Sequence, residues 1–198
     1  MSLRAFRVTM VSCVFAMMTA DASALSESDL IDGYSHAYGS TGKLSKGDFR
    51  LISKFELLQA DWNAALAPLV RGLRDPNLDT FAWARDARRT IDTMTQIRVK
   101  MSIASAQIED SGPRSITKDI DAINARMIPA WEDVRSAVMR GDDEAYREAG
   151  MRAQRLAQDK AAVAGPVIRR LREKFGDKAI DGALERELRE LARKTGMN

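Results

Sequence analysis

The sequence predicts an all-α protein, and three observations support this fold class. Apolar residues recur every three or four positions along four long stretches, the spacing that places them on one face of a helix. Strict two-residue alternation never persists, so no strand is predicted. The breaks between the stretches are short, which favours antiparallel neighbours. We therefore expect an up-down-up-down four-helix bundle over residues 45–175, with proline-kinked helices and short flanking N- and C-terminal helices.

The first 24 residues have the pattern of a secretory signal peptide, expected to be cleaved. Arg4 and Arg7 make the N-terminus positive, and residues 8–18 form a mainly apolar run. That run is too short to span a bilayer, which takes about 20 residues. An A-x-A site ends at Ala24, where signal peptidase would cut. We expect export to the periplasm; a buried first helix of a cytosolic domain is the alternative.

Cys13 is the one cysteine in the sequence, and cleavage near Ala24 removes it. The residues before it faintly resemble a bacterial lipobox, so a lipid anchor at Cys13 stays open as an alternative. A mature chain without cysteine has no disulfide, so packing must stabilise it. The formal net charge of +3 is too small to predict a nucleic-acid or membrane surface.

Residues 25–44 form an N-terminal segment, with a short helix predicted near 26–37 and then the linker AYGSTGKLS. Ser45 is predicted to cap the first long helix, and Asp48 in its first turn favours the positive end of the helix dipole. One stripe of apolar residues follows at helical spacing: Phe55, Leu58, Trp62, Leu66, Leu69 and Leu73.

The other three long helices are separated by short breaks. RDPN at 74–77 ends the first helix, and EDSGPRS at 109–115 ends the second, with Ser115 expected to cap the third. Gly141 ends the third helix and Asp142 caps the fourth. The apolar stripe of the fourth helix contains Ala145, Ala149, Ala153, Leu156, Val163, Val167, Leu171 and Phe175.

Prolines fall inside three of the predicted long helices, at Pro68, Pro129 and Pro166. Each removes one backbone hydrogen bond and crowds the carbonyl four residues earlier, so each is expected to bend its helix. A complete break is the alternative, most of all at Gly165-Pro166, where glycine adds backbone freedom.

Methionines and tryptophans on the stripes are expected to fill the core, although a binding groove or ligand pocket is the functional alternative. They are Met94, Met101, Met127, Trp62, Trp83 and Trp131.

No stretch carries a recognisable catalytic or cofactor signature, so we expect no enzyme activity, no cofactor and no metal. AYGSTGKLS has the spacing of a phosphate-binding loop, but Leu44 stands where the Mg²⁺-binding hydroxyl belongs and no strand precedes it. His36 is the one histidine, which excludes a histidine-rich zinc site, paired haem ligands and the Glu-x-x-His pairs of di-metal bundles.

Residues 176–198 form a C-terminal amphipathic helix, preceded by an arginine run. A helix of about 18 residues is marginal alone in water, so it must pack on something. We favour a protein partner over its own bundle, because the four-helix unit looks closed without this segment. The possible partner surface consists of Arg169, Arg170, Arg172, Leu184, Leu188 and Leu191.

The chain resembles the small exported helical accessory proteins of bacterial conjugal-transfer and type IV secretion systems. The shared features are its size, a signal of the form MSLRAFRVTMVSCVFAMMTADASA, and long helices between a short N-terminal segment and a C-terminal helix. The resemblance covers the whole chain and rests on layout. It implies an accessory or adaptor role in DNA or protein transfer, with protein partners in the cell envelope, and carries no site residue. We expect no direct nucleic-acid contact and no stable membrane span after signal cleavage. A periplasmic small-ligand binder and a holdase chaperone are the alternatives.

Overall fold

The computed structural model describes residues 25–75, 77–179 and 182–196, and every regular element in these ranges is helical. The predicted all-α class is therefore confirmed. The predicted signal peptide, with Cys13, lies outside the described residues. The elements are α1 (Glu27–Ala37), α2 (Lys46–Gly72), α3 (Thr80–Gln107), α4 (Ser111–Arg140), α5 (Asp143–Phe175), the 3-10 turn η2 (Gly176–Ala179) and α6 (Ala183–Thr195).

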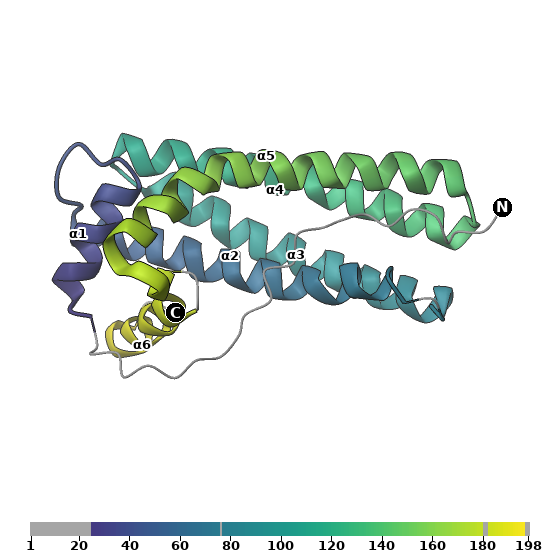
Figure 1. Ribbon diagram of the computed structural model, residues 1–198, viewed down its shortest axis with the longest axis horizontal. Coiled ribbons are helices and arrows are strands. Elements are labelled where there is room, and N and C mark those ends of the chain that lie inside the picture. The colour runs from purple at the N-terminus through teal and green to yellow at the C-terminus, as the bar shows by residue number, and fades with distance from the viewer. Residues whose placement is uncertain (1–24, 76, 180–181, 197–198) are drawn as a thin grey trace.

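The four long helices, α2 to α5, lie side by side along the long axis of the molecule (Figure 1). Each packs on the next one in the chain, which is consistent with the expected four-helix bundle. The first and last of them, α2 and α5, form no comparable interface in the described part of the chain. Short helix α1 packs on α5 and α2 at one end, and α6 packs on α2 near the same end.

Local capping residues set most of the helix boundaries. The Ser45 side chain accepts the N–H of Asp48 at 2.9 Å and caps α2, as predicted. Asp142 caps α5 through the N–H of Ala145, and Gly141 ends α4 with a φ of 64°, a left-handed conformation that glycine adopts without strain.

The predicted start of the third long helix is wrong. Helix α4 begins at Ser111, and Asp110 caps it by accepting the N–H of Gly112 at 3.0 Å. Ser115 lies inside the helix instead. Pro113 does not prevent this earlier start, because the N–H groups of the first helical turn have no partner within the helix.

All three internal prolines lie in unbroken helices, Pro68 in α2, Pro129 in α4 and Pro166 in α5. The alternative of a break at Gly165-Pro166 is therefore wrong. The C-terminal part of α5, which contains Pro166, curves toward α6 (Figure 1). This curvature brings the end of α5 over α1.

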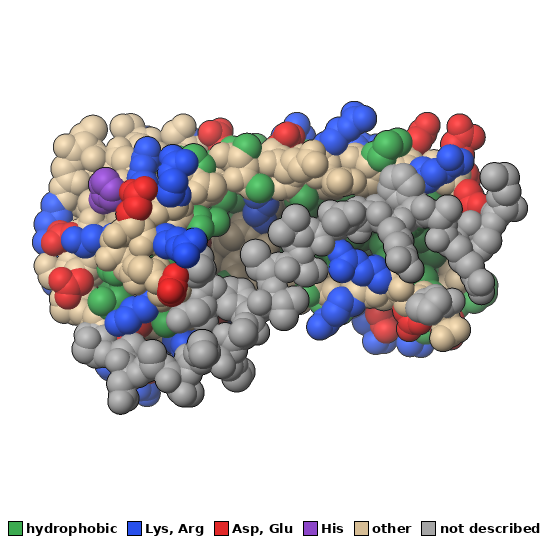
Figure 2. All heavy atoms as spheres, in the orientation of Figure 1, with side chains coloured by type: hydrophobic (Ala, Val, Ile, Leu, Met, Phe, Trp, Pro, Cys, Tyr) green, Lys and Arg blue, Asp and Glu red, His purple; other side chains and the backbone are tan. Residues whose placement is uncertain are grey.

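Two main apolar clusters form the core. One is built by α2, α3, α4 and α5 and contains all three tryptophans. The other joins α1, the start of α2, the end of α5 and α6, with Tyr34, Phe49 and Leu188 among its members. Trp62, Met94 and Met101 are fully buried, and Trp83, Met127 and Trp131 are nearly so, which confirms their predicted place in the core. On the face shown in Figure 2, basic and acidic side chains are interspersed.

Candidate functional site

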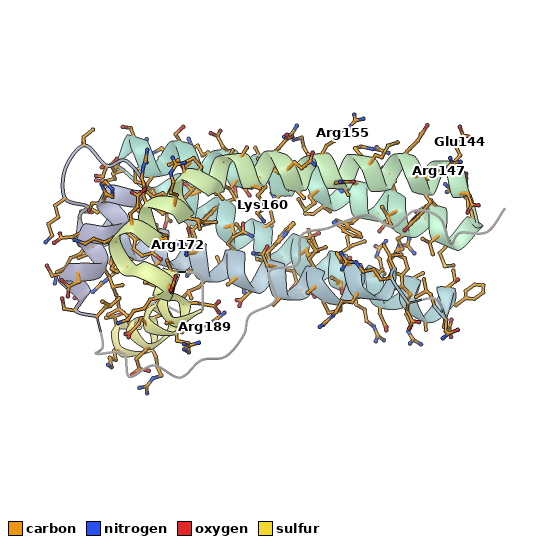
Figure 3. The ribbon with its side chains drawn as sticks, in the orientation of Figure 1. Glu144, Arg147, Arg155, Lys160, Arg172 and Arg189 are labelled. Carbon is orange, nitrogen blue, oxygen red and sulfur yellow. The ribbon has the colours of Figure 1, made fainter. Side chains whose placement is uncertain are left out.

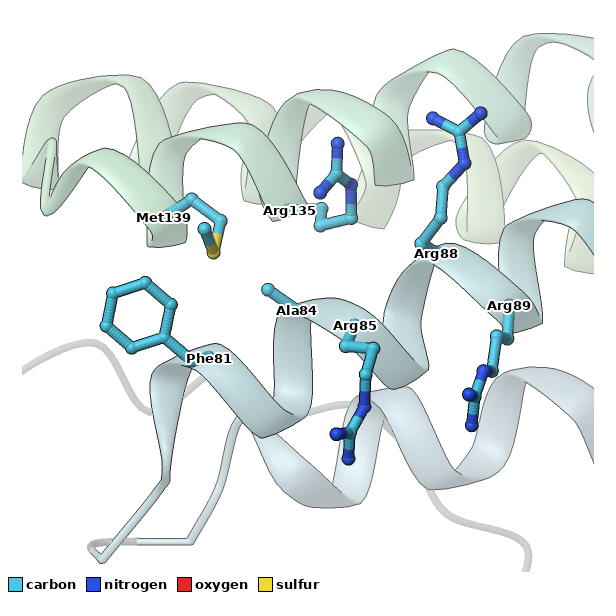
Figure 4. A pocket seen from close by; sticks show the side chains of 7 residues that line it. All are labelled: Phe81, Ala84, Arg85, Arg88, Arg89, Arg135 and Met139. Atoms are coloured by element: carbon cyan, nitrogen blue, oxygen red, sulfur yellow. The ribbon is translucent and has the colours of Figure 1, made fainter.

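A shallow hollow of about 490 Å³ lies between the N-terminal part of α3 and the C-terminal part of α4 (Figure 4). We call it the arginine hollow. Its lining residues are Phe81, Ala84, Arg85, Arg88, Arg89, Arg135 and Met139. The two helices run antiparallel, so α3 begins near the point where α4 ends. Both helices therefore contribute side chains to the hollow.

Two large apolar side chains stand at one end of the arginine hollow and are open to solvent. Phe81 is 75% exposed and Met139 is 40% exposed. They extend toward one another from α3 and α4 (Figure 4). Phe81 follows the cap residue Asp79 closely, so the helix start projects it outward while Trp83 and Ala84 turn into the core. An exposed aromatic residue facing an exposed methionine is typical of an interaction surface.

The arginines lie to one side of this apolar pair, and the three on α3 are only loosely engaged by their own chain. Arg88 and Arg135 lie between the two helices, whereas Arg85 and Arg89 extend to the other side of α3 (Figure 4). The pairs formed by the three α3 arginines have N–O distances of 3.4 to 3.9 Å. Exposed ion pairs of this kind contribute little stability, so these guanidinium groups can exchange partners at small cost.

Glu132 is a carboxylate held tightly beside the hollow. Arg135 donates to it from Nη2 at 2.6 Å and from Nε at 3.1 Å, and Arg88 approaches it at 3.4 Å. These hydrogen bonds, those from Arg135 first, lower the pKa of Glu132 below its ordinary value. Glu132 thus fixes Arg135 within α4 and contacts Arg88 across the gap, and the weakly paired α3 arginines remain available to an incoming carboxylate.

A second group of functional interest lies between the long helices, partly or fully buried, and we call it the polar layer. It consists of Glu56, Gln59 and Trp62 on α2, Asn124 on α4 and Lys160 on α5. The hydroxyl of Tyr38, at the end of α1, donates to the carboxylate of Glu56. Burial raises the pKa of Glu56, and this hydrogen bond opposes that rise.

Lys160 is the basic member of the polar layer. Its Nζ lies 5.6 Å from the centroid of the Trp62 ring. Burial lowers the pKa of Lys160 to about 7, and the negative charge of Glu56 opposes this shift. Figure 3 shows Lys160 on the side of α5 that faces α2. An amine in this setting changes its charge near neutral pH, which is uncommon for lysine.

Two atoms of the polar layer are buried without a hydrogen-bond partner: Nε1 of Trp62 and Oδ1 of Asn124. The amide nitrogen of Asn124 is used, since it donates to Oε1 of Gln59 at 3.2 Å. Unpartnered buried polar atoms are rare in folded proteins and call for an explanation. The polar layer is therefore the second candidate site.

The six residues of the predicted C-terminal partner surface do not lie together on one exposed face. Leu184 and Leu188 are 5% and 2% exposed and belong to the core cluster shared with α1. Leu191 is partly buried against that cluster. The apolar stripe of α6 thus packs on the chain's own body, because the stripe completes a cluster that α2 and α5 leave open. Arg189 of α6 adds an ion pair with Asp61 of α2 at 2.7 Å.

The three arginines of the same predicted surface differ in their roles. Arg170 donates from Nη1 to the carbonyl of Ala37 at 3.1 Å and so holds the end of α1. Arg172 is exposed and pairs with Asp177 at 3.3 Å. Arg169 is exposed. The structure does not bring these side chains together with the α6 leucines on one accessible face.

Lys43 in AYGSTGKLS is engaged by α1. Its Nζ lies 2.8 Å from Oδ1 of Asp32 and donates to Oγ of Ser28 at 3.1 Å. The neighbouring Leu44 is buried and donates its N–H to Oγ of Ser35 at 2.9 Å. These contacts hold the segment between α1 and α2 against α1. His36 is exposed in the last turn of α1.

Sequence reasoning missed both candidate sites. The polar layer had a signal, since the apolar stripe of α5 skips from Leu156 to Val163 and Lys160 falls in the gap at helical spacing. The arginine hollow had only the Arg88-Arg89 pair as a signal. Nothing in the sequence indicates that Phe81 is exposed while Trp83, two residues on, is buried.

None of the described helices is both long and apolar enough to cross a membrane. Within the same residues, no group of three or more histidine, cysteine or acidic side chains is placed to hold a metal ion. Comparison of the chain with protein-family models, with curated proteins and with solved structures gives no match.

Proposed function

We propose that this protein is an exported, non-enzymatic adaptor of a bacterial envelope machine, and that the arginine hollow docks an acidic segment of a partner protein. The periplasm and a conjugal-transfer or type IV secretion complex are the proposed setting, on the strength of the signal-like N-terminus and the layout resemblance. The observation that carries the docking proposal is the exposed pair Phe81 and Met139 among four arginines.

The chemistry of the hollow defines the partner segment. An apolar side chain of the partner would fill the space between Phe81 and Met139, where the accessible floor is almost entirely apolar. Carboxylates of the same segment would pair with Arg88 and, around α3, with Arg85 and Arg89. Aromatic residues, methionine and arginine are the residue types enriched at the centre of protein interfaces. Arginine suits this role because its planar fork binds carboxylates with two hydrogen bonds.

Photo-crosslinking in cells of the source organism tests the proposal. A p-benzoylphenylalanine at position 81 should give a discrete crosslinked protein. The matched control is the same group at Ile103, which is 55% exposed on the same helix but outside the hollow. Replacing Arg88 and Arg89 with Glu should abolish the product at position 81.

Three results would contradict docking at the hollow. They are equal crosslinking at positions 81 and 103, no crosslinked protein at position 81, and a product that survives the double charge reversal. Crosslinks to many unrelated proteins would indicate a holdase instead. Circular dichroism of each variant confirms folding, which these exposed positions should not disturb.

Small-ligand binding is a second candidate function, and the unpartnered buried atoms of the polar layer favour it. It uses none of the residues of the arginine hollow, so the two functions are compatible and separately testable.

A further inference from the structure

We propose that the partner at the arginine hollow is a second copy of this chain, whose acidic turn between α4 and α5 pairs with the arginines in a two-fold symmetric dimer. The acidic turn is residues 142–144. This inference rests on docking at the arginine hollow, the function proposed above, and names the partner that docks there.

The acidic turn supplies the carboxylates that the hollow is suited to bind. Asp142, Asp143 and Glu144 form the one run of three acidic residues in the sequence, and all three are exposed. Figure 3 shows Glu144 at the tip of the molecule, where α5 begins. Arg147 donates to the backbone carbonyl of Asp143 at 3.2 Å, and within the described ranges neither Asp143 nor Glu144 forms an ion pair. Both carboxylates are therefore available to another chain.

The arginines, the apolar pair and the acidic turn follow one another in a fixed order toward the tip. On α3, Arg88 and Arg85 lie farther from the tip than Phe81, which is one turn nearer the start of the helix. On α4, Met139 follows Arg135 by one turn, and the acidic turn begins three residues after Met139. Figure 4 shows the apolar pair at the end of the hollow and the arginines beyond it. The order toward the tip is thus arginines, apolar pair, acidic turn.

This order is self-complementary under a two-fold axis that passes through the apolar pair, perpendicular to the long helices. The axis reverses the second copy, so its Phe81 and Met139 meet those of the first copy and its acidic turn lies over the first copy's arginines. Symmetry repeats the contact on the other side of the axis. The result is an apolar centre with charged pairs toward the rim, the usual arrangement of a protein interface.

The change of ionic partners that this contact requires costs little. The arginines of α3 hold their present carboxylates at N–O distances of 3.4 to 3.9 Å, as exposed pairs of small stabilising effect. The contact also covers Phe81, which is 75% exposed in the single chain. Because the two patches are small and charged, the dimer belongs to the weak class and weakens as salt is added.

Exchanging the charges of the two patches tests the proposal, with sedimentation velocity of the purified protein over a concentration series up to about 0.5 mM, a range that covers weak interfaces. The hollow variant carries Arg88→Glu and Arg89→Glu. The turn variant carries Asp143→Lys and Glu144→Lys, and it keeps Asp142 because this residue caps α5. Each variant alone should dimerise about tenfold or more weakly than the parent, because like charges then meet at both contacts. An equimolar mixture of the two should dimerise as the parent does, because both contacts again pair opposite charges.

The matched control carries Asp119→Lys and Glu173→Lys, at two exposed acids away from the acidic turn, and has the same net charge as the turn variant. It should dimerise like the parent, and circular dichroism should show every variant folded. The proposal is overturned by a parent that stays monomeric, by a mixture no more associated than either variant alone, or by a control as weakened as the turn variant.

The crosslinking experiment at position 81 separates failure of this inference from failure of docking itself. A product of twice the mass of the chain supports the second copy. A monomeric parent together with a crosslink to a different protein overturns the second copy and leaves docking at the hollow intact. No product at position 81 overturns both.

Discussion

The carboxylate of Asp48, in the first turn of α2, accepts the backbone N–H of Glu109 at 2.7 Å across 61 residues of sequence. Its second oxygen accepts the N–H of Asp110 at 3.2 Å. Asp110 in turn caps α4. One buried side chain thus links the start of α2 to the turn between α3 and α4.

Replacing Asp48 with alanine should lower the free energy of unfolding by about 2–3 kcal/mol, because two backbone donors of a tight turn lose a charged acceptor. Urea denaturation measures this change. Asp119→Ala, at an exposed position of α4, is the control and should be within about 0.5 kcal/mol of the parent. An equal, small effect of both substitutions would show that the Asp48 contacts do not stabilise the turn.

Gly33→Ala should destabilise the protein, against the usual preference of helices for alanine. A Cβ at position 33 would overlap the ring of Phe175, which rests on α1. Gly150→Ala in α5 is the matched control, since nothing lies within 4 Å of its added Cβ, and it should stabilise by about 0.5–1 kcal/mol. Thermal melts should therefore shift in opposite directions. A higher melting temperature for both variants would mean that Phe175 moves aside freely.

Lys160 should make stability rise with pH. Its pKa is about 7 in the folded protein against an ordinary value of 10.5, so between these values the unfolded chain binds more protons. The free energy of unfolding then increases as pH rises through this window. Below pH 7 the amine is protonated in both states, so the free energy of unfolding no longer changes with pH through this group. Lys160→Met should be more stable than the parent at pH 7, and the difference should shrink by pH 9.5.

Urea denaturation of both proteins at pH 7 and pH 9.5 measures this effect, with Lys118→Met as the control for losing a lysine. A constant difference between the parent and Lys160→Met at the two pH values would show that the amine is not desolvated in the folded state. Glu56, the charged group that acts on Lys160 from α2, stays in place in every variant.

Leu188→Ala should cost about 2–4 kcal/mol of stability, because this α6 side chain is 2% exposed in a shared core cluster. Leu191→Ala, in the same helix but partly exposed, should cost less. Chemical denaturation ranks the two. If both substitutions left the free energy of unfolding almost unchanged, the apolar stripe of α6 would be better explained as a partner surface.

Local signals were enough to predict most of the helices, because caps such as Ser45 and Asp142 act within one turn. The start of α4 was mispredicted for a tertiary reason. Asp110 and Ser115 are both good cap residues, and Asp110 has the further advantage that Asp48 binds its N–H from α2. No local pattern contains that contact.

Tertiary contacts between distant residues also determine where α6 packs and how the candidate sites form. An amphipathic stripe such as that of Leu184 and Leu188 fits a partner or the chain's own body equally well, and only the cluster left open by α1, α2 and α5 decides between them. The exposure of Phe81 likewise depends on where α4 ends. Lys160 alone interrupts a stripe visibly in the sequence.

The helices α1 and α6 are both fastened at one end of the long helices, whereas the arginine hollow lies at the start of α3, near the other end (Figure 1). Helix α5 has 33 residues, which at 1.5 Å per residue gives a length of about 50 Å. If a partner docks at Phe81 as proposed, the protein would act as a spacer as well as a surface. That partner would be held at the opposite pole from α1 and α6, about 50 Å away.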